Sequence, residues 1–123
     1  MLLIDDSRTM REVLKVYLMG GKFTFDEAES AERALEILRT ANVDLIVADI
    51  NMPGMNGIEF VQAVRSDPLR RVRNVPVVLV TGDKSEETVS RVRDAHPDAF
   101  LRKPLDAEKL LRTVELLLRV RAQ

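Results

Sequence analysis

Apolar residues along the chain fall into two kinds of segment that alternate. Four short runs are almost continuously apolar, the pattern of strands buried on both faces of a parallel sheet; they cover residues 2–4, 45–48, 77–80 and 99–101. A fifth run, Phe23-Thr24-Phe25, alternates apolar and polar residues, so we predict a strand nearer the edge of the sheet.

Helical spacing of apolar residues separates these runs. Stripes with steps of three and four residues predict five amphipathic helices, which contain residues 10–18, 31–38, 58–64, 89–95 and 110–118. Gly20-Gly21 is expected to end the first helix. Ser30 and Asp106 are predicted N-caps of the second and fifth helices, and the fourth is predicted to start near Ser85.

The chain therefore repeats a strand followed by a helix five times. Parallel strands need such crossovers, and right-handed crossovers place helices on both faces of the sheet. The length of 123 residues fits one domain, and no linker-like stretch divides it. We predict a single α/β domain over residues 1–123, built on a doubly wound (βα)5 parallel sheet.

Composition narrows the classes of function. Nineteen basic and 20 acidic residues give a net charge of −1, which argues against a dominant nucleic-acid surface. No apolar run reaches the ~20 residues of a membrane span, and Asp5-Asp6 comes too early for a signal peptide. The absence of cysteine excludes disulfides and thiolate zinc sites, and the single histidine, His96, is expected in a loop. We expect the cluster of Arg65, Arg70, Arg71 and Arg73 to lie on a solvated helix end and the loop after it.

Polar residues follow the apolar runs where the strands are predicted to end. Asp5 and Asp6 follow the first run. Asp49 ends the third, Thr81 follows the fourth, and Lys103 comes after the fifth. Ligands of open α/β sheets bind outside the carboxyl ends of the strands, so these side chains are predicted to converge on one edge. Three carboxylates repel one another unless a cation lies among them.

The predicted cluster favours a hard divalent cation and phosphoryl chemistry. Mg²⁺ typically takes one or two carboxylates together with water and phosphate oxygens, and a cluster without histidine or cysteine disfavours zinc. An ammonium and a hydroxyl beside a metal-bound carboxylate are the parts of a phosphoryl-transfer site, in which a carboxylate attacks phosphorus.

Four motifs, in this order, resemble the receiver domain of bacterial two-component response regulators. They are Asp5-Asp6, Asp49 with the later Met52-Pro53-Gly54-Met55-Asn56-Gly57, Thr81-Gly82, and Lys103-Pro104. The resemblance covers essentially the whole chain. It implies a flavodoxin-like fold with strand order 2-1-3-4-5. It also implies a signalling module rather than an enzyme, one that catalyses only its own phosphotransfer and slow dephosphorylation.

The resemblance assigns roles at the predicted site. It makes Asp49 the acceptor of a phosphoryl group from the phosphohistidine of a histidine kinase. It implies a Mg²⁺ site, which Mn²⁺ also suits. Asp6, Asp49 and the main-chain carbonyl of Asn51 would be direct ligands, and Asp5 would act through a water.

The resemblance also implies a set of switch residues. Lys103 would pair with Asp49 at rest and with the phosphoryl group afterwards, while Thr81 would move to hydrogen-bond a phosphoryl oxygen. Phe100 occupies the aromatic switch position, and the peptide bond before Pro104 is expected to be cis. The surface of the fourth helix, fifth strand and fifth helix is the expected output face.

Two further residues are expected to set the lifetime of the phosphoryl group. In receivers, the positions of Asn51 and Asp83 flank the line of attack of water. Neither residue is bulky or cationic, so a moderately short-lived phosphoryl state is predicted.

The resemblance implies partners as well. They are a sensor histidine kinase or phosphotransfer protein, an effector or output domain, and a second copy in a phosphorylation-dependent dimer. The expected location is the cytoplasm, without membrane or direct nucleic-acid binding. No output domain follows the last predicted helix, so the chain is either a stand-alone receiver or one excised from a longer protein.

Three other functions share part of this pattern. A haloacid-dehalogenase-type phosphatase also uses an aspartyl nucleophile, but it needs a second acid where this chain has Asn51. A pseudo-receiver that never takes phosphate usually lacks one of the acids, the threonine or the lysine. A flavodoxin needs a hydroxyl-rich phosphate loop after the first strand, where this chain has its acid pair.

Overall fold

Five parallel strands form one sheet in the computed structural model, which describes residues 1–83 and 85–122. Neighbouring strands pair in parallel throughout. Their order is β2-β1-β3-β4-β5, which confirms the expected flavodoxin-like topology. The strands are β1 (Leu2–Ile4), β2 (Asp26–Ala28), β3 (Ile46–Asp49), β4 (Val77–Thr81) and β5 (Ala99–Arg102).

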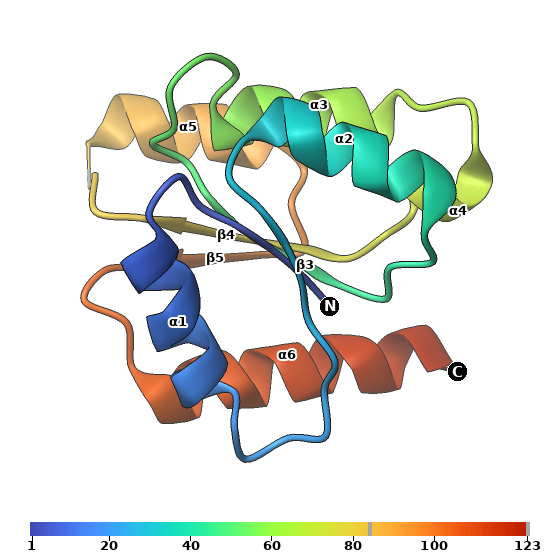
Figure 1. Ribbon diagram of the computed structural model, residues 1–123. Coiled ribbons are helices and arrows are strands. Elements are labelled where there is room, and N and C mark those ends of the chain that lie inside the picture. The colour runs from blue at the N-terminus through green and yellow to red at the C-terminus, as the bar shows by residue number, and fades with distance from the viewer. Residues whose placement is uncertain (84, 123) are drawn as a thin grey trace.

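Helices cover both faces of this sheet (Figure 1). The helices are α1 (Arg8–Tyr17), α2 (Ala31–Thr40), α3 (Gly57–Arg65), α4 (Arg70–Arg73), α5 (Glu86–Ala95) and α6 (Ala107–Ala122). Helices α1 and α6 lie on one face and α2, α3 and α5 on the other, as a doubly wound domain requires. The five predicted helices are present, and α4 is an additional single turn. Across residues 1–83 and 85–122, no helix combines the length and apolar character needed to cross a bilayer.

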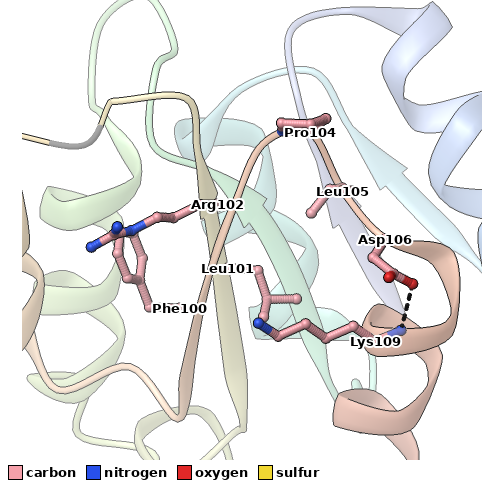
Figure 2. Close-up of a pocket in the computed structure, with 7 residues that line it drawn as sticks. All are labelled: Phe100, Leu101, Arg102, Pro104, Leu105, Asp106 and Lys109. Carbon is pink, nitrogen blue, oxygen red and sulfur yellow. Dashed lines mark hydrogen bonds between the residues drawn. The ribbon is translucent and has the colours of Figure 1, made fainter.

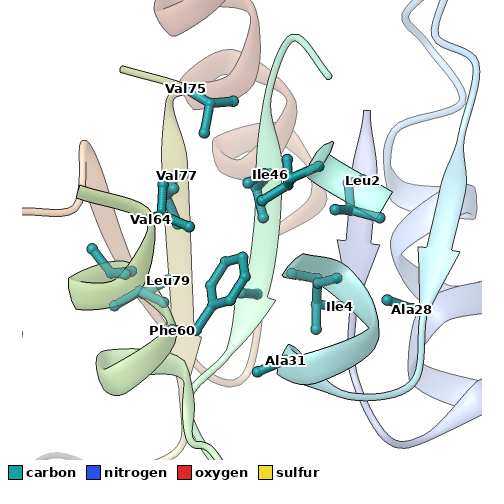
Figure 3. Close-up of a cluster of buried hydrophobic side chains, with 14 of the residues drawn as sticks. Leu2, Ile4, Ala28, Ala31, Ile46, Phe60, Val64, Val75, Val77 and Leu79 are labelled. Atoms are coloured by element: carbon teal, nitrogen blue, oxygen red, sulfur yellow. The ribbon is translucent and has the colours of Figure 1, made fainter. Parts of the chain in front are cut away.

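Alternate residues of the central strands point to opposite faces of the sheet and divide the core in two. Leu2 and Ile4 of β1 join the cluster under α2, α3 and α5, whereas Leu3 joins the cluster against α1 and α6. Phe60 of α3 is fully buried among the strand side chains of the larger cluster (Figure 3). Because helices cover both faces, the central strands are apolar at nearly every position.

Side-chain caps start three helices near the predicted residues. Ser30, Ser85 and Asp106 each accept a hydrogen bond from the backbone N–H three residues later, at 3.1, 3.2 and 3.1 Å. These bonds satisfy N–H groups that have no partner inside the helix. The predicted starts of α2, α5 and α6 are therefore confirmed.

The apolar pattern places the second strand wrongly. The strand is Asp26–Ala28, paired in register with Leu2–Ile4, and not Phe23–Phe25. Phe23 and Phe25 are half-buried, pack edge to face with ring centroids 6.4 Å apart, and contact the cluster of α1 and α6. The true edge strand begins with two exposed acids. It carries little apolar signal, and the neighbouring aromatic pair showed the stronger pattern.

Side-chain hydrogen bonds hold Arg65, Arg71 and Arg73, which corrects the expectation of a solvated cluster for these three, whereas Arg70 is exposed as expected. Arg65 donates to three main-chain carbonyl groups just before β4 and β5, and it pairs with Asp98 at 2.6 Å. Arg71 donates to three carbonyl groups at the end of α2. His96 is exposed at the C-terminal end of α5, with a left-handed φ of 61°, in keeping with its expected loop position.

Candidate functional site

Parallel strands bring the predicted site residues to one edge of the sheet. Asp5 follows the last residue of β1 and Asp49 is the last residue of β3, and these two strands are neighbours in register. Thr81 ends β4, and Lys103 follows the last residue of β5. Since the carboxyl ends of all these strands meet, the convergence that the sequence predicts is present.

Asp5, Asp6 and Asp49 form a compact cluster of carboxylates. One oxygen of each lies within 4.8 Å of the others. Asp5 and Asp49 are buried, with exposed fractions of 3% and 7%, whereas Asp6 is exposed. Carboxylate oxygens are the ligands that hard divalent cations prefer. The donor chemistry of this cluster therefore fits Mg²⁺ or Mn²⁺.

The surroundings of Asp5 act against its negative charge. Burial raises the pKa of the Asp5 carboxyl above its ordinary value, and the charge of Asp49 adds to this effect. The N–H of Ser7 donates to Asp5 Oδ1 at 2.8 Å, and this bond and the Lys103 ammonium act in the opposite direction. The net upward shift of the Asp5 pKa means that Ser7 and Lys103 do not fully offset the cost of burying the Asp5 charge. A bound cation would offset this cost.

Lys103 is the positive group of the site. Its Nζ lies 3.4 Å from Asp49 Oδ2. The other oxygen, Asp49 Oδ1, accepts a hydrogen bond from the N–H of Asn51 at 3.3 Å. Both contacts are longer than typical charge-assisted hydrogen bonds. Both Asp49 oxygens therefore have a partner, but neither makes a short hydrogen bond.

A close approach at Gly57 shapes the loop that follows Asp49. A Cβ atom at position 57 would lie 2.5 Å from the main-chain oxygen of Asp49, so a side chain does not fit there. Asn56 and Glu59 cap the start of α3 reciprocally. The loop is thus fixed where it enters α3, and Asn51 is exposed near its beginning.

Thr81 is fully buried and links β4 to the loops on either side of it. Its hydroxyl oxygen accepts a hydrogen bond from the N–H of Asp83 at 3.0 Å. Its main-chain carbonyl accepts one from the N–H of Lys103 at 2.8 Å. The peptide bond between Lys103 and Pro104 is cis, as expected. Asp83 itself is exposed, and its carboxylate accepts hydrogen bonds from the start of α5.

Phe100 is half-buried and lines two surface hollows. One hollow, of about 500 Å³, extends from β5 to the start of α6 (Figure 2). The other, of about 370 Å³, lies between α5 and β5, and Val89 and Val92 contribute to its lining. Figure 2 shows Phe100 and Arg102 on one side of β5 and Leu101 on the other. The aromatic ring therefore has surface space on the side of α5.

Arg11 supports the acid pair and was missed by the sequence reasoning. Its guanidinium donates to the main-chain carbonyl of Asp5 at 2.6 Å and pairs with Glu27 of β2 at 2.9 Å. Its side chain is only 13% exposed. The available signal was its place on α1, shortly after the acid pair, but a main-chain partner leaves no pattern in the sequence.

Comparison with known sequences identifies a family for this chain. A family model of the response regulator receiver domain matches residues 1–115. Chemotaxis protein CheY of Pseudomonas aeruginosa is 36% identical over 115 residues, which cover 93% of this chain and 91% of that protein. Transcriptional regulatory protein ResD of Bacillus subtilis is 30% identical over 122 residues, covering 99% of this chain and 49% of ResD. The matching unit thus makes up most of one relative and about half of another.

Solved structures show the same arrangement of strands and helices. The signal receiver domain of a signal transduction histidine kinase from Syntrophus aciditrophicus superposes with a TM-score of 0.89 at 29% sequence identity. The superposition covers 96% of this chain and 88% of that chain. A CheY-like receiver domain protein from Methanospirillum hungatei superposes with a TM-score of 0.87 at 25% identity.

Proposed function

Because the chain belongs to the response regulator receiver domain family, we propose that Asp49 accepts a phosphoryl group from a phosphohistidine. The observation that carries this proposal is the cluster of Asp5, Asp6 and Asp49, with the Lys103 ammonium 3.4 Å from Asp49. A receiver that no longer takes phosphate usually lacks an acid, the threonine or the lysine. This chain keeps all of them, which supports an active receiver.

The proposed transfer is a nucleophilic displacement at phosphorus. An oxygen of Asp49 attacks the phosphorus atom, and the bond between phosphorus and the imidazole nitrogen breaks. The electron pair of that bond stays on the imidazole, which leaves as a neutral ring when its other nitrogen carries a proton. Asp49 becomes an acyl phosphate, and the Lys103 ammonium neutralises charge on the phosphoryl oxygens.

The proposal includes dependence on Mg²⁺. Asp6, Asp49 and the main-chain carbonyl of Asn51 would hold the cation directly, and Asp5 would hold it through a water. Bound there, the cation supplies neutralisation of the phosphoryl charge. The net upward shift of the Asp5 pKa, caused mainly by burial and increased by the charge of Asp49, supports this assignment.

We propose that Thr81 and Phe100 pass the change at Asp49 to a surface. Phosphorylation adds roughly two negative charges and strong acceptor oxygens, and Thr81 supplies a hydroxyl at the next strand end along the sheet. Movement of Thr81 toward Asp49 leaves space into which Phe100 rotates. The surface of α5, β5 and α6 then changes shape, and this surface meets the next partner.

The lifetime of the acyl phosphate is proposed to depend on Asn51 and Asp83. Both side chains are exposed, and neither is bulky or cationic. Water therefore reaches the phosphoryl group, and the proposed state is moderately short-lived.

The protein is thus proposed to act as a signalling module without an external substrate. It would receive its phosphoryl group from a sensor histidine kinase or a phosphotransfer protein in the cytoplasm. It would then act on an effector or output domain, and phosphorylation would favour a dimer. One relative is named for chemotaxis and another for transcriptional regulation. The same receiver unit therefore occurs in proteins with different outputs.

Intact-mass measurement after incubation with phosphoramidate and Mg²⁺ tests the proposal. We expect one phosphoryl adduct in the parent protein and its loss from Asp49 in Asp49→Asn. Asp26→Asn is the matched control, because Asp26 is an exposed acid at the opposite end of the strands, and it should keep the adduct. Chelation of Mg²⁺ should prevent the transfer. A parent protein without adduct at saturating donor and Mg²⁺ contradicts the proposal, and sustained hydrolysis of a phosphomonoester would indicate a phosphatase instead.

A further inference from the structure

Asp83 makes hydrogen bonds in two directions from the loop between β4 and α5. Its backbone N–H donates to the hydroxyl oxygen of Thr81 at 3.0 Å. Its carboxylate accepts from the N–H of Ser85 at 2.8 Å and from the hydroxyl of Thr88 at 2.7 Å. One residue therefore joins the buried threonine of the site to the first turn of α5.

Hydrogen bonds connect Asp83, Ser85 and Thr88 at this first turn, and the donor of each bond can be assigned. Ser85 is the N-cap, and its hydroxyl oxygen accepts from the N–H of Thr88 at 3.2 Å. The two hydroxyl groups lie 3.0 Å apart. The Thr88 proton points to Asp83, so the proton between the hydroxyls comes from Ser85. Hydrogen bonds from Ser85 and Thr88 hold the pKa of the Asp83 carboxyl below its ordinary value, in agreement with its role as the acceptor of both groups.

The Thr81 hydroxyl has a proton to offer. Its oxygen accepts from Asp83, and within residues 1–83 and 85–122 its own proton has no hydrogen-bond acceptor, although Thr81 is fully buried. An acceptor that arrives beside Thr81 would therefore attract this hydroxyl. The 3.0 Å bond from Asp83 already has ordinary length, so a displaced Thr81 oxygen either pulls the Asp83 backbone with it or loses the bond.

We propose that Asp83 is a positioning residue that couples the Thr81 hydroxyl to the N-terminal turn of α5. The inference rests on the proposed function only for the event that displaces Thr81, namely phosphorylation of Asp49. The coupling itself is a property of the unphosphorylated chain. A change at Thr81 alters the support that Asp83 gives to Ser85 and Thr88, and the start of α5 shifts or loosens.

Hydrogen exchange on the unphosphorylated full chain tests the coupling by a double-mutant cycle. Thr81→Val removes the hydroxyl while keeping the shape of a fully buried side chain, and Asp83→Ala removes the carboxylate. We expect Asp83→Ala to lower the protection of the Thr88 and Val89 amides about fivefold, the scale of a lost N-cap side chain. Thr81→Val should lower it less, and the double variant should match Asp83→Ala alone.

Matched variants separate the coupling from a general loss of helix stability. Glu87 is an acid in the same turn, and its side chain makes no hydrogen bond with residues 1–83 or 85–122. Glu87→Ala should therefore leave the Thr88 and Val89 amides protected. Asp83→Asn keeps an oxygen for the Ser85 N–H, so it should restore part of the protection. Strictly additive effects of Thr81→Val and Asp83→Ala would overturn the proposal, and so would an equal loss in Glu87→Ala.

The same amides measured with phosphoramidate and Mg²⁺ connect the coupling to the site. Among molecules that carry the adduct, the parent and Glu87→Ala should show changed protection of Thr88 and Val89, and Asp83→Ala should not. A full response in Asp83→Ala, or no response in an adduct-bearing parent, would overturn the proposed route. If the parent takes no adduct, the proposed function fails, while the double-mutant cycle still decides the coupling.

Discussion

The two ends of the sheet differ in how fully their charged side chains are compensated by contacts within the chain. At the amino ends of β4 and β5, Arg65 donates four hydrogen bonds, three to main-chain carbonyl groups and one to Asp98. Asp98 also accepts from the N–H of Val77 at 2.7 Å. At the carboxyl ends, the carboxylates of Asp5, Asp6 and Asp49 lie close together, and the Lys103 ammonium is 3.4 Å from Asp49.

This difference separates the charges that hold the fold from those available for chemistry. Arg65 and Asp98 are neutralised by close contacts within the chain, so their removal leaves polar groups without partners. The acids of the site are only partly neutralised, so the proposed cation and phosphoryl group would meet no strong internal contact that must first break. Neutralising substitutions at the two ends should therefore change stability with opposite signs.

The largest effect is expected at the amino ends of the strands. Arg65→Met keeps most of the side-chain volume but removes all four hydrogen bonds. We expect a loss of about 2–3 kcal/mol in the free energy of unfolding, because partly buried carbonyl groups and the Asp98 charge lose their partner. Urea denaturation followed by circular dichroism measures the loss.

Arg70→Met is the matched control for this substitution. Arg70 is exposed on α4 and makes no side-chain hydrogen bond or ion pair within residues 1–83 and 85–122. Its replacement should change the free energy of unfolding by less than about 0.5 kcal/mol. Equal losses in the two variants would show that the arginine contacts at this end do not stabilise the fold.

A smaller effect of opposite sign is expected at the carboxyl ends. Without divalent cations, Asp6→Asn should raise the free energy of unfolding by about 0.5–1 kcal/mol, because one of three repelling charges is removed. Asp26→Asn, an exposed acid far from the cluster, should not. Saturating Mg²⁺ should reverse the order of parent and Asp6→Asn, because a cation that binds the folded state stabilises the parent more. A parent that stays less stable than Asp6→Asn in Mg²⁺ would contradict Asp6 as a ligand.

The smallest effect is expected where α1 and β2 border the site, and it depends on pH. Hydrogen bonds and charge from Lys15 and then Arg11 lower the pKa of Glu27 below its ordinary value. The ion pairs therefore stabilise the fold above the ordinary pKa of a glutamate, and this contribution is lost as the pH falls through the lowered value. Glu27→Gln should therefore lose less stability than the parent between pH 7 and pH 3, measured as the midpoint of urea unfolding at each pH.

Glu36→Gln is the control for this pH series. Glu36 pairs only with Arg33 among the described residues, and both side chains are largely exposed. Its replacement should leave the pH dependence of the midpoint close to that of the parent, since exposed ion pairs contribute little. A pH series in which Glu27→Gln also follows the parent would show that these ion pairs do not contribute.

The sequence predicted the carboxyl-end site far better than the amino-end network, and the reason is physical. Asp5, Asp49 and Thr81 follow apolar runs directly, so the end of each strand places them without further knowledge. Arg65 contacts carbonyl groups of segments 8 to 31 residues away. Every residue has a carbonyl group, so the sequence does not mark those that accept.

The misplaced edge strand and the missed α4 follow from the same limit. An apolar pattern detects an element only through the residues it buries. Ala28 is the buried residue of β2, and Val72 is that of α4. One buried residue defines no period in the sequence. The position of β2 is set by its pairing with β1, and α4 forms through local backbone hydrogen bonds.

The acids at the start of β2 also bear on how the protein behaves at high concentration. An edge strand offers backbone donors and acceptors to which a strand of another molecule can add, and such addition begins aggregation. Asp26 and Glu27 are both exposed on this edge. Glu27 is neutralised by its ion pairs with Arg11 and Lys15, so the charge that would repel a second copy along this edge is mainly that of Asp26. Asp26, one of the acids that hid this strand from the apolar pattern, therefore opposes growth of the sheet from one molecule into the next.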